Sequence, residues 1–205
     1  MSRPPPAPVP VVPTAPVTSV RSSLSPRRFA LYILFASMTM LFGAVLVGFV
    51  FTRLQNPVWR TPEMAALPAG LWLSTALLIG VSISFQAALA AARKNRSETL
   101  NRRLLLGTVL VAGFLGAQVQ NWAIIHRGEL LSPIRTLYPS TFYMLTGIHA
   151  LHVVGGLIPL AIVIFRARRR EYSSSHHEGL SLCVQYWHYL GVVWLVLFTA
   201  LELLT

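Results

Sequence analysis

Three histidines lie inside long apolar stretches, where a titratable side chain is costly to place. His149 and His152 are three residues apart and so share one face of a helix, and His188 lies in Tyr-Trp-His-Tyr at 186–189. Polar groups at membrane depth are candidates for functional sites. They could ligate a haem or metal, with His152 and His188 as the axial pair. Their depths in the bilayer differ by roughly 8 Å at 1.5 Å per residue, which favours the alternative of hydrogen bonds between helices.

Other polar side chains in these stretches are neutral. Gln118 and Asn121 are three residues apart, so both amides are placed to hydrogen bond to a neighbouring helix, and Gln86 has the same potential. The apolar stretches hold no carboxylate pair for proton relay, no lysine for a Schiff base and no arginine ladder for voltage sensing. We therefore expect the chain to perform no chemistry by itself, with no catalytic, cofactor or metal site of its own.

The elements that carry these residues are five apolar runs, each near the roughly 20 residues needed to cross a bilayer. The sequence is 54% hydrophobic and 11% charged, which excludes an ordinary soluble domain. No charged residue lies inside a run before Glu202. The sequence predicts an all-α integral membrane bundle of five transmembrane helices. The predicted spans are 29–51, 67–92, 104–125, 138–165 and 180–204.

Residues 1–26 form a segment rich in Pro, Val and Ser with no aromatic residue. Such a composition buries too little surface to pack, so we expect a disordered cytoplasmic tail followed by a transmembrane domain over 27–205.

The basic residues predict the orientation of the helices, because Lys and Arg resist translocation. Thirteen of the 17 fall in the tail and in the second and fourth loops, and four fall in the intervening loops. The N-terminus is therefore expected in the cytoplasm and the C-terminus in the periplasm. The net charge of +11 points to anionic lipid headgroups and not to nucleic acid. The four basic residues of the intervening loops are Arg53, Arg60, Arg127 and Arg135.

Two sequence motifs resemble a known family. The run Phe-Tyr-Met-Leu-Thr-Gly-Ile-His-Ala-Leu-His-Val-Val-Gly-Gly at 142–156 resembles the penultimate helix of subunit III of the haem-copper (cytochrome c) oxidases. The run Tyr-Trp-His-Tyr-Leu-Gly-Val-Val-Trp-Leu at 186–195 is similar to the last helix of that subunit. Weaker agreement covers 114–118 and 37–42. The length and the five spans are similar to the short bacterial form of the family.

The resemblance implies a non-catalytic component of a respiratory oxidase in the bacterial inner membrane, supporting aerobic electron transport coupled to proton translocation. Haem and copper would reside in a partner, catalytic subunit I, with subunit II beside it. The family also implies phospholipid bound in a cleft between helix groups. The residues carried over as packing and hydrogen-bonding positions, and not as ligands, are His149, His152, Tyr186, Trp187, His188, Trp194 and Gln118.

The sequence departs from the family at four positions that usually carry a carboxylate, which here are Met38, Asn121, Ser181 and Gly191. We interpret the chain as a divergent member with a neutral interior, in which carboxylate-dependent proton roles are not expected. Because of these departures, an accessory subunit of a nitric oxide reductase is an alternative interpretation of the chain. A b-type haem protein using His152 and His188 is the alternative from a different class. The oxidase implied by the resemblance takes its electrons from either cytochrome c or a quinol.

Overall fold

The computed structural model describes residues 25–59, 67–131 and 136–204, and all their regular secondary structure is α-helical. Five helices are long and apolar enough to cross a membrane. This confirms the predicted all-α membrane bundle of five helices. The helices are α1 (Pro26–Gln55), α2 (Gly70–Arg93), α3 (Ser97–Leu131), α4 (Tyr138–Arg168) and α5 (Glu178–Leu204).

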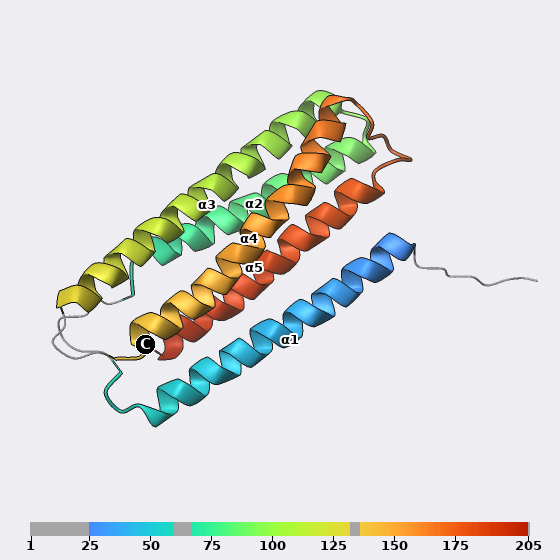
Figure 1. The fold of residues 1–205 in the computed structure, drawn as a ribbon. Coiled ribbons are helices and arrows are strands. Elements are labelled where there is room, and N and C mark those ends of the chain that lie inside the picture. The colour runs from blue at the N-terminus through green and yellow to red at the C-terminus, as the bar shows by residue number, and fades with distance from the viewer. Residues whose placement is uncertain (1–24, 60–66, 132–135, 205) are drawn as a thin grey trace, which may run out of the picture.

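Four of the helices form a closed bundle and the first lies outside it. Helix α2 packs on α3 and α5, and α4 packs on the same two helices, so α2 to α5 surround one shared interior. Helix α1 contacts only α5 and α4 among the described helices, and Figure 1 shows it along one side of the bundle. Residues of α4 and α5, which carry the two sequence motifs, therefore lie between α1 and the rest of the molecule.

The helices extend beyond the apolar runs at most of their ends. Helix α3 begins at Ser97 and ends at Leu131, whereas its predicted span was 104–125. An α-helix satisfies its own backbone hydrogen bonds, so it can continue past the hydrocarbon into the headgroup region, where Arg102 and Arg103 are tolerated. The basic stretch expected as a loop at 93–103 is thus mostly helix. Only Lys94–Arg96 separate α2 from α3, and Asn95 takes the left-handed backbone conformation that such a turn needs (φ 54°).

Helix α1 begins at Pro26, inside the stretch predicted as tail. The Ser25 Oγ accepts a hydrogen bond from the Arg28 backbone N–H (3.4 Å), and Pro26 occupies the first helical position, where its missing N–H costs nothing. Residues 1–24 lie outside the described residues, so the disorder of the tail stays a prediction.

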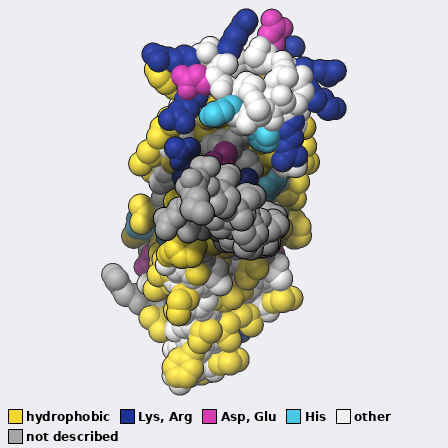
Figure 2. Space-filling view, turned by 90° about the vertical axis from the view of Figure 1, so that its right-hand side faces the viewer, with side chains coloured by type: hydrophobic (Ala, Val, Ile, Leu, Met, Phe, Trp, Pro, Cys, Tyr) yellow, Lys and Arg dark blue, Asp and Glu magenta, His cyan; other side chains and the backbone are white. Residues whose placement is uncertain are grey.

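Basic side chains gather at one end of the molecule. Figure 2 shows Lys and Arg concentrated at one end, above a body whose visible side chains are mostly hydrophobic. The start of α1, the α2–α3 turn and the α4–α5 loop meet at this end, and the Asn95 Oδ1 accepts a hydrogen bond from the Ser174 backbone N–H (2.8 Å). The bundle therefore has one strongly basic end.

Candidate functional site

The ring of His149 on α4 lies among aromatic rings from three other helices. Its side chain is 0% exposed. Its ring centroid lies 5.1 Å from that of Trp194 on α5, 5.8 Å from Phe114 on α3 and 6.2 Å from Phe42 on α1. Neither ring nitrogen has a hydrogen-bond partner among the described residues. His149 is thus a packing centre with unused polar atoms.

Two tryptophan–threonine hydrogen bonds join neighbouring helices around this centre. The Trp194 Nε1 donates to the Thr75 Oγ1 (3.0 Å), which links α5 to α2. The Trp122 Nε1 donates to the Thr146 Oγ1 (2.9 Å), which links α3 to α4. Each threonine hydroxyl in turn donates to the backbone carbonyl one helical turn earlier. Each indole N–H and each threonine hydroxyl therefore has a hydrogen-bond partner. Such bonds inside a membrane bundle contribute about 0.6 kcal/mol each.

Two buried amides of α3 complete the polar interior. The Asn121 Nδ2 donates to the Ser74 Oγ of α2 (3.4 Å), which is the type of interhelical bond the sequence predicted. Gln118 is 1% exposed, and neither atom of its amide has a partner among the described residues; the Asn121 Oδ1 also has none. A buried polar atom without a partner costs about 1–3 kcal/mol. We call these six residues the polar core: Ser74, Thr75, Gln118, Asn121, Thr146 and His149.

The other two histidines face different helices. The His152 Nδ1 donates to the Ile148 carbonyl of its own helix (2.8 Å), and its ring lies 5.1 Å from that of Phe42 on α1. The His188 Nε2 donates to the Gln86 Oε1 on α2 (3.2 Å). Helices α1 and α2 make no contact with each other in the described part of the chain. The two histidines considered as a haem pair are thus each engaged with a separate neighbour.

The second motif packs against Gly156, the last glycine of the first motif. The Tyr186 hydroxyl donates to the His152 carbonyl (2.9 Å), and the buried Trp187 ring lies 5.5 Å from that of Phe85 on α2. A Cβ atom on Gly156 would lie 2.7 Å from Cε1 of Tyr186, well inside van der Waals contact. Only glycine at this position allows α4 and α5 to approach this closely.

The four positions that lack a carboxylate have different surroundings. Met38 is buried at 3% exposure, and Asn121 belongs to the polar core. Ser181 is partly exposed near the start of α5. Gly191 lines a groove between α2 and α5, where an added Cβ would lie 3.3 Å from the Ser82 Oγ. The four departures are therefore distributed over the molecule and do not share one site.

Sequence reasoning missed the partners of the motif residues. Phe42 and Phe114 lie at the edges of the two weakly matching segments, which was the available signal for them. Thr75 and Thr146 are recognised only once the register between helices is known. In the part of the chain that the structure describes, no three His, Cys, Asp or Glu side chains are grouped so that they could hold a metal ion.

Comparison with known proteins places this arrangement in a family. Residues 28–204 match the family described as Cytochrome c oxidase subunit III. The chain is 29% identical to cytochrome c oxidase subunit 3 of Thermostichus vulcanus, over 87% of this chain and 88% of that protein. It is 30% identical to the subunit of the same name from Synechocystis, over 87% and 76%. A probable cytochrome c oxidase subunit 3 of Nocardia farcinica is 29% identical, over 81% and 82%. With both motifs and all of the five helices except the first two residues of α1 inside the matched region, the chain belongs to the cytochrome c oxidase subunit III family.

Proposed function

We propose that this chain is the non-catalytic third subunit of a respiratory haem-copper oxidase in a bacterial membrane, beside catalytic subunit I and subunit II. The family match over 28–204 carries the proposal. Haem and copper reside in the partners, and this chain supplies a membrane-embedded scaffold that stabilises them.

The use of the motif residues supports a scaffold role. His149, Trp187 and Trp194 are buried against rings of other helices, and Tyr186 and His188 hydrogen bond to α4 and α2. Side chains that are engaged in helix packing are positioned to hold helices together.

A cytoplasmic N-terminus is part of the proposal. The basic end of the molecule carries the first residues of α1, the α2–α3 turn and the last residues of α4, including Arg28, Lys94 and Arg168. Lys and Arg are retained on the cytoplasmic side, where anionic headgroups also attract them.

A groove between α1, α4 and α5 supports phospholipid as a bound component. Apolar side chains of all three helices line it, and Arg166 lies at its basic end. An acyl chain fits an apolar groove, and a guanidinium favours a phosphate headgroup. The lining includes Leu31, Leu34, Gly155, Pro159 and Ile162.

The decisive experiment is purification of the tagged chain in mild detergent, with mass spectrometry of the co-purifying subunits and an absorption spectrum. We expect a haem-copper catalytic subunit to co-purify, and the haem absorption to leave with it when the subunits are separated. A haem spectrum that stays with the isolated chain would contradict the scaffold role. A nitric oxide reductase catalytic subunit in its place would support that alternative assembly.

A variant pair tests the contribution of the second motif. His188→Ala removes the hydrogen bond to Gln86 and should lower the yield of assembled complex, with the haem spectrum per complex unchanged. Gln185→Ala, at an exposed position one turn earlier on α5, is the matched control and should assemble normally. Loss of a haem band with assembly intact would show instead that His188 is a ligand.

The lipid component has its own test. Arg166→Gln should reduce the phosphorus content of the delipidated complex, whereas Arg168→Gln, which is not part of the groove lining, should leave it unchanged. Equal phosphorus content in both variants and the wild type would argue against a specific site.

A further inference from the structure

The polar core contains more hydrogen-bonding capacity than the protein itself uses. His149, Gln118 and Asn121 are each 99–100% buried, yet five of their side-chain atoms have no partner among residues 25–59, 67–131 and 136–204. Nearly all buried polar atoms in folded proteins are paired with protein or with ordered water. These atoms therefore need a partner that the described residues do not supply.

The three side chains belong to one region of the interior. The Trp122–Thr146 bond fixes the level of α3 against α4, and the two helices run in opposite directions. One turn further along each helix brings Gln118 level with Ala150, next to His149. Asn121 lies three residues from Gln118, about 4.5 Å along the same helix, and reaches Ser74 on α2.

The chemistry of the unused atoms identifies the class of ligand. The Gln118 Nε2 is a donor, the Gln118 Oε1 and Asn121 Oδ1 are acceptors, and a neutral imidazole supplies one donor and one acceptor. An ion satisfies groups of one kind only, because a cation takes acceptors and an anion takes donors. Water both donates and accepts, and a buried water typically makes about three hydrogen bonds.

We propose that the polar core is an internal hydration site, in which ordered water hydrogen bonds to His149 and Gln118. The water links α3 to α4 at the level where Trp194 and Thr75 link α5 to α2. The site thus adds a second polar link between α3 and α4, beside the Trp122–Thr146 bond. It is independent of which oxidase the chain joins.

The direct test is a structure of the assembled complex by electron cryomicroscopy at a resolution that shows water. We expect separate density within about 2.7–3.2 Å of a His149 ring nitrogen and of the Gln118 amide. A dry interior, in which the His149 N–H points at the Phe114 or Trp194 ring, would overturn the proposal. A direct His149–Gln118 hydrogen bond would overturn it equally.

Variants supply a second readout. His149→Leu and Gln118→Met should each lower the midpoint of thermal unfolding by several degrees, because each leaves the shared water with too few partners. The double variant should lower it by less than the sum of the two. His152→Leu is the matched control, since His152 bonds to its own helix, and its effect should add to that of Gln118→Met. Simple additivity of His149→Leu with Gln118→Met would argue against shared water.

Discussion

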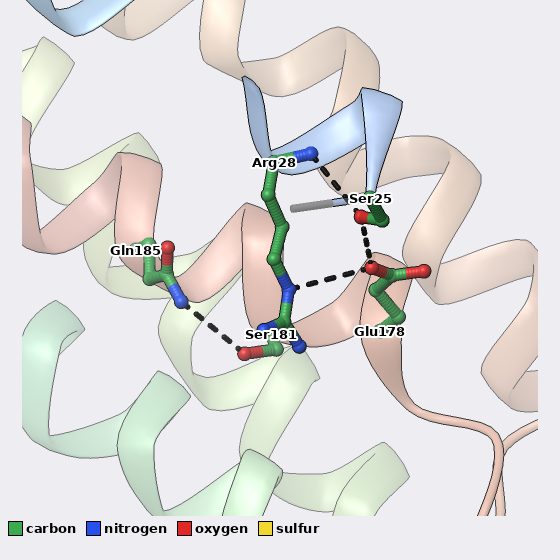
Figure 3. A network of polar contacts seen from close by, with 5 residues as sticks. All are labelled: Ser25, Arg28, Glu178, Ser181 and Gln185. Atoms are coloured by element: carbon green, nitrogen blue, oxygen red, sulfur yellow. Dashed lines mark hydrogen bonds and ion pairs between the residues drawn. The ribbon is translucent and has the colours of Figure 1, made fainter. Parts of the chain in front are cut away.

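Helix α1 and the α2–α5 bundle are held by different means. Each pair of adjacent bundle helices has an interhelical hydrogen bond, and buried rings fill the space between them. Among the described residues, helix α1 is attached by polar contacts to α5 alone, at its start, its middle and its end. Its start is joined by Ser25 and Arg28 to Glu178, as Figure 3 shows, and its end by the Arg53 Nε, which donates to the Leu204 carbonyl (2.6 Å).

The difference indicates that α1 is the part of the fold that can separate from the rest. Three α1 side chains are buried in the described structure, those of Met38, Phe42 and Phe49. Much of its apolar surface is exposed, for example Met40 at 78% and Leu54 at 75%, and so faces lipid or a partner. We expect changes in the bundle to affect the whole molecule, and changes at the α1 contacts to loosen that helix alone.

The largest effect is expected from Trp194→Ala. The substitution removes the bond to Thr75 and the ring contacts with Phe114 and His149. Large-to-small changes at such sites cost about 3 kcal/mol or more, so unfolding in detergent should shift strongly. Trp72→Ala, at a residue 63% exposed, is the control and should shift it little. Similar shifts for both would show that the interior contributes no more than the periphery.

A smaller effect is expected from Gly156→Ala. The new methyl group would press on Tyr186 and Trp187, and overpacking costs about 1–3 kcal/mol. The neighbouring Gly155→Ala is the matched control, because a Cβ there meets no described atom within 4 Å. Thermal unfolding of the pair measures the contact between α4 and α5 directly. An equal loss in both variants would point to backbone effects and not to close packing.

The sequence predicted the helices better than their contacts. The apolar runs predict all five helices, because a bilayer forces charged residues such as Arg93 and Arg166 towards the ends. The sequence could not predict that α3 extends from Ser97 to Leu131, since hydropathy detects only the part of a helix that lies in hydrocarbon.

For the site, spacing alone placed His149 on one helix face with His152, but the two side chains have different surroundings. His149 is fully buried among rings, whereas His152 bonds to its own helix. That distinction depends on the register between helices, which a single sequence does not contain. Thr75 and Thr146 could not be identified as hydrogen-bond partners from the sequence, because that too requires the register between helices.

Tyr189→Phe removes the hydroxyl by which α5 contacts the middle of α1, and it should loosen α1 without unfolding the bundle. The Tyr189 hydroxyl pairs with the Thr39 Oγ1 (2.8 Å) and reaches the Phe35 carbonyl (3.3 Å), whereas the ring stacks on Phe35 and would remain. We expect a loss of about 0.6 kcal/mol and faster hydrogen exchange confined to α1. Tyr186→Phe removes a similar hydroxyl that bonds to α4 instead, so its faster exchange should appear in α4 and α5. Identical exchange patterns would refute the separate attachment of α1.

The smallest effect is expected at the basic end, from Glu178→Gln. The Glu178 carboxylate accepts a hydrogen bond from Ser25 (2.5 Å) and pairs with Arg28 (3.4 Å) across the gap between α5 and α1 (Figure 3). Both side chains of the ion pair are well exposed, so water and salt screen it and the global stability should not change measurably. The local result should be fraying of the first turn of α1, measured as faster tryptic cleavage after Arg27 and Arg28.

Glu171→Gln is the matched control, because Glu171 pairs with Arg166 at 3.8 Å at the same end and does not join α1 to α5. Raising the salt concentration should speed cleavage of the wild type towards the Glu178→Gln rate and leave the variant unchanged. Equal rates in the two variants would mean that the helix start is held by its apolar contacts alone.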